Sequence, residues 1–459
     1  MPDDLQHEPA PQPDALTEGP PAWTARAERI ALWALAATAV LTVLTLIWYV
    51  RLDNAHQPLK GWAALAAVGA LLLICGIVVL VRPFRLTHGR TVLTSALVSV
   101  VLAAGTVSTW MHISKDDAHL LSPGTIVNSS DQARALLDKD KSAKKTTRIP
   151  TGLFIQQLTF DGPTAVQVSG YVWQRVPKGF PKEYEGVVLP DAEDSYGTKE
   201  VYRDVHTDGS ATVGWYFKAR VIQHFDYKRF PLDRQSVRLR LWDADRADNS
   251  IVLEPDFHSY PPWEYKRMLG TDPELVLSGW ERTFSGWSYA DPVYETTLGG
   301  NLRPYAQAPS APPELYFNVG LAREAAMPML SSLIRWGIVA VMIFLALFVY
   351  SKERGELRPN LGFSTWAVIT FSVSMLLVIV VDQTAVREQT ATAMAYVEWF
   401  ALSLYVVILL VALNAVRLTS KRTTPGLEWQ DNRLAKLLYW PLLLTLIFAA
   451  TLYVFSPRW

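Results

Sequence analysis

The sequence has only one cysteine, Cys75, and it lies inside a long apolar run. A lone cysteine has no partner for a disulfide, so every folded part of the chain must be stabilised by its hydrophobic core. In such a run the thiol is expected to pack as a small hydrophobic side chain. This excludes a small fold held together by disulfides.

The chain also lacks an excess of charge of either sign, because 43 Lys and Arg residues balance 43 Asp and Glu residues. Nucleic-acid binding requires a basic surface, so we exclude nucleic acid as a partner. The sequence contains no paired metal-ligand spacing, no glycine-rich phosphate loop, and no Ser/His/Asp or Cys/His set. It therefore predicts no metal site, no cofactor and no enzymatic activity.

Long apolar runs are what the sequence has in abundance, since 50% of its residues are hydrophobic and they occur in blocks. A run of about 20 apolar residues crosses about 30 Å of hydrocarbon as a helix. Such runs occur at 29–50, 62–81, 91–111, 330–350, 361–381, 395–416 and 435–455. The sequence predicts a multi-pass membrane protein.

The loops between these runs predict the orientation, because loops rich in Lys and Arg remain in the cytoplasm. The loop between the second and third runs contains Arg82, Arg85, His88 and Arg90. The loops 351–360 and 417–434 are also basic. We therefore expect a protein of the plasma (inner) membrane, with a cytoplasmic N-terminus, an external segment 112–329 and an external C-terminus.

Between the third and fourth apolar runs, short stretches of aromatic and β-branched residues alternate with Gly, Pro and Asp. The stretches are 151–160, 164–175, 212–224, 236–243, 250–254, 278–285 and 314–323. In 166–173 and 236–241 apolar and polar residues alternate, as half-buried strands require. This pattern predicts an antiparallel β-sandwich.

Residues 223–237 join two of the predicted strands. Pro231 cannot donate a backbone hydrogen bond, so the chain must leave the sheet there. Phe230 and Leu232 flank the proline and need to be buried. We therefore expect the tip of this loop to dock on another part of the molecule.

The same loop resembles the signature loop of pentameric ligand-gated ion channels, whose Phe-Pro-Phe-Asp core corresponds to Phe230-Pro231-Leu232-Asp233. Gln223 and Val237 stand where animal members have the two cysteines of this loop, as in bacterial relatives. Further segments that resemble the family are 152–158 with 168–171, 278–281, 315–323, 396–398 and 431–441. Three N-terminal apolar runs lie outside the family plan.

The resemblance implies a membrane protein with an extracytoplasmic antiparallel β-sandwich and an α-helical transmembrane domain. The expected domains are a disordered cytoplasmic tail at 1–28, a three-helix module at 29–111, a linker at 112–148, a ligand-binding β-sandwich at 149–325 and a four-helix channel domain at 326–459. The implied partners are the lipid bilayer, permeant ions, a small-molecule or proton agonist, and further copies in a homo-pentamer.

In this family the second of the four helices lines the pore, and the corresponding helix here is expected at 361–381. Steps of three and four residues place on one stripe Asn360, Ser364, Ala367, Phe371, Ser374 and Val378. Ala367 stands where leucine is common. The alternative interpretation is that the serines bond back to the preceding turn or let neighbouring helices approach.

Glu353 and Glu356 precede this helix, where the family places the charges that select ions. Arg354 and Arg358 are interleaved with them, so the sign of the selectivity stays open, although we favour cations. The alternative is a solvated, salt-bridged turn.

For coupling between the two domains, the resemblance pairs Arg323, at the end of the last strand, with Asp233 and with Asp161 in the first hairpin turn. Phe230 and Pro231 belong to the same region. We expect the three charged groups to converge, because charge-assisted hydrogen bonds are stronger than neutral ones.

Aromatic side chains are candidates for binding an ammonium group through cation–π attraction, or else form the core. They are Trp173, Tyr216, Trp242, Trp287, Tyr289 and Tyr294, the last three on a segment, 286–313, that is expected to form a flap over the ligand. If protons are the agonist, the titrating candidates are His206, His224 and His258.

The sequence leaves two functions open. One is a ligand-gated or proton-gated channel, and the other is a non-conducting seven-helix sensor or scaffold with a receptor-like domain.

Overall fold

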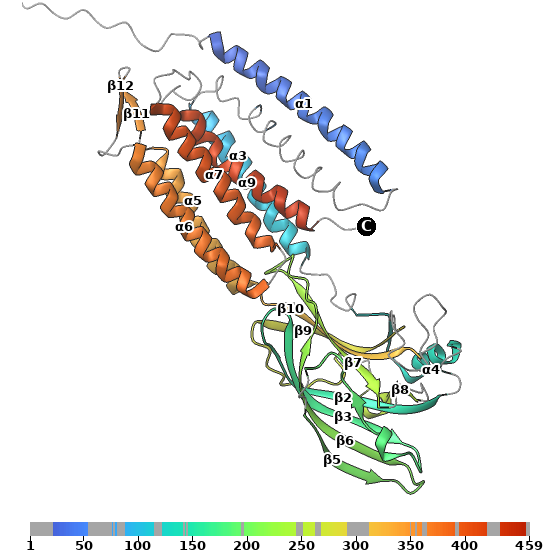
Figure 1. The fold of residues 1–459 in the computed structure, drawn as a ribbon. Helices are drawn as coiled ribbons and strands as arrows, with labels where there is room; N and C mark the ends of the chain where they lie inside the picture. Colours follow the sequence, from blue (N-terminus) through green and yellow to red (C-terminus); the bar gives the residue numbers. More distant parts are fainter. Residues whose placement is uncertain are drawn as a thin grey trace, which may run out of the picture. The chain divides into compact units, whose positions relative to one another are not determined.

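The computed structural model describes most of the strand-rich part of the chain and most of its apolar helices (Figure 1). The described residues are 22–53, 76, 79, 88–113, 122–140, 143, 146–193, 197–244, 251–261, 268–291, 312–348, 350–353, 356–359, 365–390, 394–419 and 432–455. They form two compact units. One comprises 1–109, 339–376 and 402–459, and the other comprises 110–338 and 377–401.

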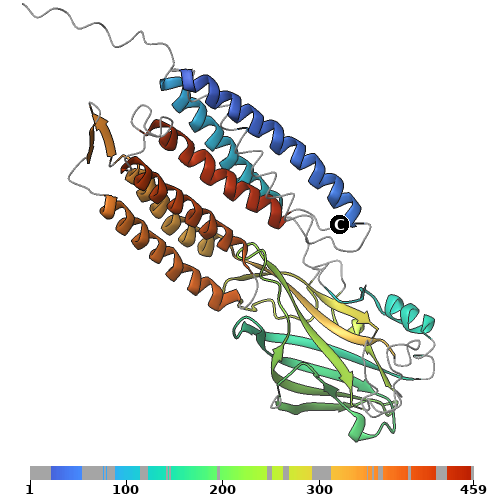
Figure 2. The ribbon, with the colours of Figure 1, turned by 45° about the horizontal axis from the view of Figure 1, so that its top comes forward.

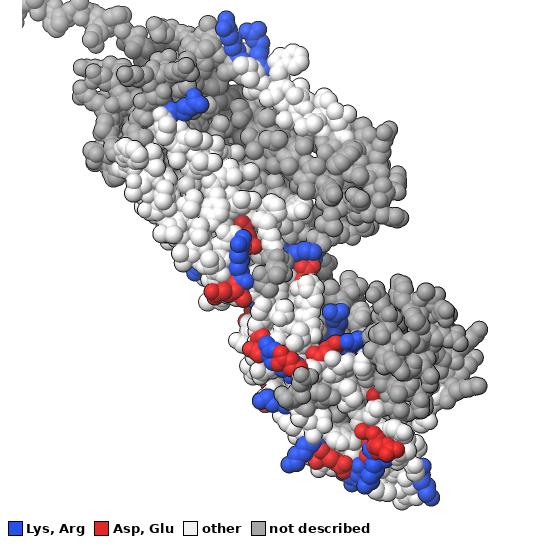
Figure 3. All heavy atoms as spheres, viewed as in Figure 1, with Lys and Arg blue, Asp and Glu red and all other residues white. Residues whose placement is uncertain are grey.

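Within the described residues, five helices are long and apolar enough to cross a membrane. They are α3 (His88–Ile113), α5 (Ala326–Ala346), α6 (Thr365–Thr390), α7 (Tyr396–Thr419) and α9 (Arg433–Phe455). On the face seen in Figure 3, the described surface of the helices carries few charged side chains, whereas the strand-rich part carries many. This is the pattern of a multi-pass membrane protein with β and helical domains.

The N-terminal helices are described in part. Helix α1 (Ala22–Asp53) covers the run predicted at 29–50, and its start at Ala22 lies inside the segment expected to be a disordered tail. The run predicted at 62–81 lies outside the described residues, except for residues 76 and 79.

Ten of the described strands form two five-stranded sheets (Figure 2), and β11 (Tyr350–Glu353) and β12 (Glu356–Pro359) form a separate two-stranded sheet. The first has the order β5-β6-β3-β2-β8, and the second has the order β1-β9-β10-β7-β4. The first contains β2 (Thr147–Phe160), β3 (Ala165–Val176), β5 (Gly197–Val205), β6 (Ala211–Ile222) and β8 (Ile251–Pro255). The second contains β1 (Thr125–Val127), β4 (Val187–Val188), β7 (Arg234–Asp243), β9 (Trp280–Ala290) and β10 (Glu314–Arg323). Neighbouring strands are antiparallel, apart from the parallel pair β2 and β8.

The alternation predicted for 236–241 is present in β7, where Val237, Leu239 and Leu241 are buried while Arg238 and Arg240 are partly exposed. The segment expected to be a linker contains β1 and helix α4 (Ser130–Lys139), and β1 pairs with β9. Strand β9 continues to Ala290, so the first residues of the expected flap are part of a sheet.

Gly170 allows β3 to approach β2 closely. A Cβ atom at this position would lie 2.0 Å from the carbonyl oxygen of Phe154 and 3.0 Å from the Cα of Ile155, next to a register shift in β2. Because the obstacle is backbone, it cannot move aside as a side-chain tip can.

We therefore expect Gly170→Ala to lower the free energy of unfolding by about 1 to 3 kcal/mol, the usual cost of overpacking. The matched control is Gly197→Ala in β5, where nothing lies within 4 Å of the added Cβ. Denaturant titration in detergent, followed by tryptophan fluorescence, measures both. Equal midpoints for the two variants would contradict the close approach.

Candidate functional site

The loop between β6 and β7 leaves the sheet at residues 223–233, as the proline predicts. Its tip is a pair of tight turns, in which Phe230 N donates to Tyr227 O at 2.9 Å and Leu232 N donates to Arg229 O at 2.7 Å. The peptide bond between Phe230 and Pro231 is cis. Phe230 and Pro231 are buried and Leu232 is partly buried, so the expected burial of the two flanking apolar residues is complete for Phe230 and partial for Leu232.

Two side-chain amides close this loop. The Gln223 amide accepts from Arg238 N at 3.1 Å and donates to Ser236 O at 3.4 Å, and these two residues flank Val237. The Gln235 amide accepts from Asp226 N at 3.2 Å and donates to Asp226 O at 2.9 Å. Hydrogen bonds of Gln223 thus tie the start of this loop to the two residues that flank Val237.

Asp233 and Arg323 form a bidentate ion pair at the end of the loop. Arg323 Nε lies 2.6 Å from Asp233 Oδ1, and Nη2 lies 3.2 Å from Oδ2. The Arg323 side chain is only 14% exposed, and the Asp233 side chain only 1%. Gln235 Nε2 donates to the same carboxylate at 2.8 Å, and Arg323 N donates to Asp233 O at 3.2 Å. The pair joins the loop to the last residue of β10.

Aromatic rings surround the Arg323 guanidinium. Its Cζ lies 4.0 Å from the ring centroid of Trp280, 4.7 Å from that of Phe230 and 6.0 Å from that of Tyr227. Phe160, from the first sheet, stacks on Trp280 at 4.6 Å. Burial raises the pKa of Tyr227 to about 12, so the phenol is neutral at pH 7. The guanidinium is therefore held by one carboxylate and by cation–π contacts.

The loop tip also contacts the first turn of α7. The Phe230 carbonyl accepts from Val397 N at 3.3 Å. This N–H is one of the first four of the helix, which have no partner inside it, so the loop satisfies a donor that the helix leaves free. On the other side, Glu324 N donates to Gly279 O at 2.9 Å, and α5 begins at Ala326.

Glu398 connects the start of α7 to the end of α6. Its buried carboxylate, 2% exposed, accepts from Ala395 N at 2.9 Å, from Gln383 Nε2 at 3.0 Å and from Arg387 Nε at 2.7 Å. Ala395 precedes the helix and Glu398 is its third residue, the spacing of a capping box. Sequence analysis marked 396–398 as a family pattern but did not identify this role of Glu398.

Of the three charged groups expected to converge, Asp233 and Arg323 are in contact, whereas Asp161 is paired elsewhere. Asp161 pairs with Arg220, whose Nε lies 2.6 Å from Asp161 Oδ2, and the two side chains are 47% and 36% exposed. Arg220 also contacts Glu193. The cause is the strand order: Asp161 follows β2 and bonds to Ala165 at the start of β3, and β3 pairs with β6, which carries Arg220. The hydrogen bond from Arg220 lowers the pKa of Asp161.

Helix α6 buries one face, formed by Val368, Ser372, Ile379, Val386 and Thr390. Of the expected pore stripe, Ser374 and Val378 are exposed, whereas Ala367 and Phe371 are partly buried. The row opposite the buried face consists of Thr370, Ser374, Leu377, Val381, Thr384 and Glu388, all exposed. The stripe expected from the sequence therefore lies between the buried face and the fully exposed row, and its role in a pore stays a prediction.

Several expected pore and selectivity residues lie wholly or partly outside the described residues. Asn360 and Ser364 lie outside the described residues. Glu353 ends β11 (Tyr350–Glu353) and pairs with Glu356 of β12 (Glu356–Pro359), and both side chains lie outside the described residues. Ser374 Oγ donates to Thr370 O at 3.0 Å, which is the back-bonding that the alternative interpretation expected.

The ligand candidates have different surroundings. Trp287 and Tyr289 were expected on a flap, but they lie inside β9 and are 0% and 2% exposed. Trp287 packs edge-on against Phe317, and the Tyr289 hydroxyl donates to Leu253 O at 2.7 Å. Both are core residues, and they lie in a strand that pairs with β1 on one side and with β10 on the other. Tyr294 lies outside the described residues.

Trp173, Tyr216 and Trp242 are partly exposed. Trp173 Nε1 donates to Asp256 Oδ2 at 3.1 Å, and Tyr216 meets the edge of Tyr171 at 5.5 Å. These two belong to the first sheet and Trp242 to the second.

Trp242 belongs to a polar cluster that sequence analysis missed. Its Nε1 donates to Glu314 Oε1 at 2.7 Å, and Tyr316 donates to the other oxygen of that carboxylate at 3.2 Å. Arg240 Nη1 lies 3.9 Å from Glu314, and Arg240 Cζ lies 5.6 Å from the Trp242 ring. Arg240 is also paired with Asp191. The Arg240 guanidinium therefore lies near both the Trp242 ring and the Glu314 carboxylate, which are hydrogen-bonded to each other.

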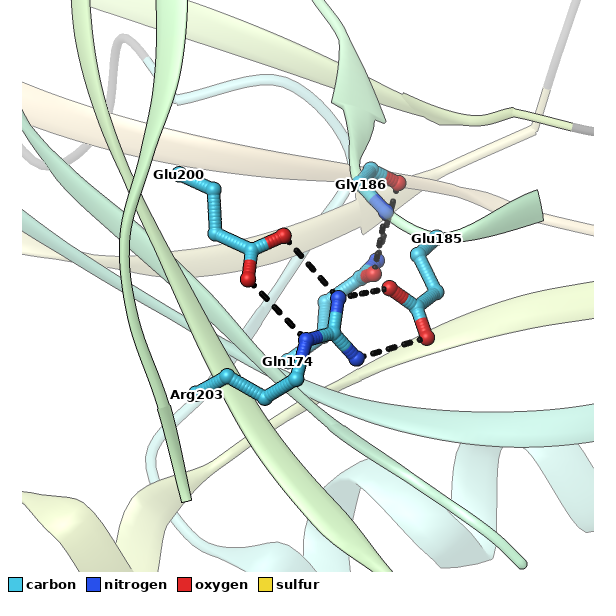
Figure 4. Close-up of polar contacts among 5 residues, drawn as sticks. All are labelled: Gln174, Glu185, Gly186, Glu200 and Arg203. Carbon is cyan, nitrogen blue, oxygen red and sulfur yellow. Dashed lines mark hydrogen bonds and ion pairs between the residues drawn. The ribbon is translucent and has the colours of Figure 1, made fainter. Parts of the chain in front are cut away.

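A further ion cluster joins a loop to the first sheet (Figure 4). Arg203 of β5 donates to Glu185 at 3.2 and 2.6 Å and to Glu200 at 3.0 and 2.9 Å. The Gln174 amide of β3 exchanges two hydrogen bonds with the Gly186 backbone, of 3.0 and 2.7 Å. The hydrogen bonds to Glu185 and Glu200 raise the pKa of Arg203. Together, the hydrogen bonds of Arg203 and Gln174 hold Glu185 and Gly186 against β5 and β3 of the first sheet. These two residues directly precede β4, which belongs to the second sheet.

Comparison of the chain with protein-family models and with curated proteins finds no match.

Proposed function

We propose that the chain is a subunit of a pentameric ligand-gated or proton-gated ion channel. In this proposal the two sheets form an extracytoplasmic β-sandwich that senses the agonist, and α6 lines the pore. The observation that carries the proposal is the Asp233–Arg323 pair in a loop whose tip contacts the first turn of α7.

The contacts supply a continuous route from sheet to helices. Strand β10 ends at Arg323 and leads within three residues to α5. The loop held by Arg323 contacts Val397 of α7, and Glu398 of α7 binds Gln383 and Arg387 of α6. A shift of β10 against β7 would therefore reach three of the four C-terminal helices through hydrogen bonds.

The exposed row of α6 has the chemistry of a gated water path. Hydroxyl groups in this row come from Thr370, Ser374 and Thr384. In a pentamer, Leu377 and Val381 from the five subunits would form apolar constrictions that can exclude water. Glu388 lies at the far end of this row. The neighbouring charges are paired, Asp382 with Arg335 and Arg387 with Glu398. The exposed carboxylate of Glu388 would therefore set the charge at this end of the row, and a negative charge there favours cations.

The cluster at Trp242 supports a small organic cation as the agonist, because an aromatic ring and a buried carboxylate there both lie close to one cation, the guanidinium of Arg240. The decisive test is recording from purified protein in planar bilayers, challenged with acid and with a panel of amines while the reversal potential is measured. Agonist-evoked current with a cation-selective reversal potential is expected. Absence of current under every condition would instead favour a non-conducting sensor or scaffold.

Cysteine accessibility separates the pore face of α6 from its buried face. In a Cys75→Ser background, single cysteines at Leu377, Val381 or Thr384 should react with a charged methanethiosulfonate reagent, because thiols in a water-filled path can ionise. Reaction should block most of the current and be about tenfold faster with agonist present.

The matched controls are cysteines at Ile379 and Val386, on the buried face of the same helix. They should leave the current unchanged during the same exposure. Unreactive cysteines in the exposed row would place that row in lipid, and α6 would then not line the pore.

A further inference from the structure

Helix α3 lies outside the four-helix plan of the proposed family, yet one of its faces is packed. The buried stripe is Thr91, Ser95, Val98, Leu102 and Thr106. Its opposite face is apolar and open, with Leu93, Leu97, Val100 and Val101 more than half exposed. A helix with one polar, buried stripe and one open apolar face is suited to pack on other helices within a membrane.

The partner of this stripe is α9. Val98 and Leu102 pack against Leu438, Leu444 and Phe448. Gly105 leaves room for the ring of Phe448, which would lie only 3.0 Å from a Cβ atom there.

A hydrogen bond from α3 completes the backbone of α9. Ser95 Oγ donates to the carbonyl oxygen of Leu437 at 2.5 Å. In a regular helix this carbonyl would accept from residue 441, but residue 441 is Pro441, which has no N–H. A carbonyl without a donor is costly in a bilayer, so Ser95 satisfies a group that α9 cannot satisfy itself.

At its other end, α3 contacts the start of α7. Trp110 Nε1 donates to the Tyr396 hydroxyl at 2.8 Å. Tyr396 is 0% exposed, and its ring packs edge-on against Phe400 at 5.2 Å. Trp110 lies 6.4 Å from Phe400, ring to ring. The next residue after Tyr396 is Val397, whose N–H binds the loop at Phe230 O.

We propose that α3 is a fifth helix of the channel domain and that Trp110 is a positioning residue for the contact between the loop and α7. The indole holds Tyr396, and Tyr396 sets where Val397 N meets the loop carbonyl. The proposal concerns how the proposed channel is coupled and therefore rests on the proposed function. Its structural half, that Trp110 orders the start of α7, can be tested without current.

The first experiment is hydrogen–deuterium exchange of the full-length protein reconstituted in lipid. Trp110→Phe keeps an aromatic ring and removes the donor, and Tyr396→Phe removes the acceptor. Each should raise exchange in peptides that cover 394–401 by about fivefold or more. The control is Leu97→Ala on the open face of α3, which should leave that exchange unchanged. Unchanged exchange in both aromatic variants overturns the proposal, whether or not the protein conducts.

The second experiment measures the agonist concentration for half-maximal current. Each single variant should raise this concentration about fivefold, and the double variant Trp110→Phe/Tyr396→Phe should match either single variant. Additive shifts would mean that the two side chains act separately, which overturns the positioning role. If the wild-type protein passes no current while exchange responds as expected, the proposed channel function fails and the contact stands.

Discussion

Replacing Arg323 by alanine should abolish the agonist-evoked current and lower the free energy of unfolding by about 3 to 5 kcal/mol. The reason is that Asp233, only 1% exposed, would be left as a buried charge with no cation. Asp233→Ala should have a similar effect, since the guanidinium would then lie uncompensated among Trp280, Phe230 and Tyr227. Denaturant titration in detergent and bilayer recording measure the two effects separately.

Loss of folding alone would also abolish current, so a variant without the uncompensated charge is needed. The double variant Asp233→Asn/Arg323→Gln removes both charges and keeps side chains that can hydrogen-bond. It should recover most of the lost stability but not the full current, because the bidentate geometry is gone. Wild-type current from this double variant would show that the pair serves folding only.

The matched control is Asp161→Ala, which breaks an ion pair at the surface. Asp161 and Arg220 are both at least a third exposed, so removing this carboxylate should leave the free energy of unfolding nearly unchanged. The current should remain. If Asp161→Ala were as damaging as Asp233→Ala, the three groups would act together, as the sequence suggested.

The sequence predicts the loop well because its determinants are local. Pro231 cannot donate a ladder hydrogen bond whatever surrounds it, so it belongs in the loop between β6 and β7, and Phe230 must be buried somewhere. Strand β7 could be predicted from the sequence equally well, because Val237, Leu239 and Leu241 alternate with polar residues. These features need no knowledge of distant neighbours.

The parts that sequence analysis missed depend on neighbours. Strand β5 is exposed along nearly its whole length, so it has no alternating face to detect. The end of β9 is buried on both faces, with Ser285, Trp287 and Ser288 all at 0% exposure, so its aromatic residues looked like a flap. On α6 apolar residues occur all around the helix, and only the packing shows which row is open. Ser95 bonds to a residue 342 positions away, a contact that no local pattern contains.

Replacing Glu398 by alanine should have the second large effect. Glu398 is the shared acceptor for Ala395 N, Gln383 Nε2 and Arg387 Nε, and it is almost completely buried. Without it, the backbone N–H of Ala395 and the Gln383 amide lose their acceptor. We expect the free energy of unfolding to fall by about 2 to 4 kcal/mol and the current to be lost, because α6 and α7 would no longer be tied at this point.

Two related variants separate the cap from the charge. Glu398→Gln keeps one acceptor oxygen, so it should preserve the bond to Ala395 N and retain partial current. Arg387→Ala removes only a cation whose side chain is 65% exposed, and should cost less than about 1 kcal/mol while leaving the current in place. The loss of stability and of current should therefore be largest for Glu398→Ala, smaller for Glu398→Gln and smallest for Arg387→Ala. If Arg387→Ala were the most damaging of the three, the ion pair rather than the helix cap would carry motion from α7 to α6.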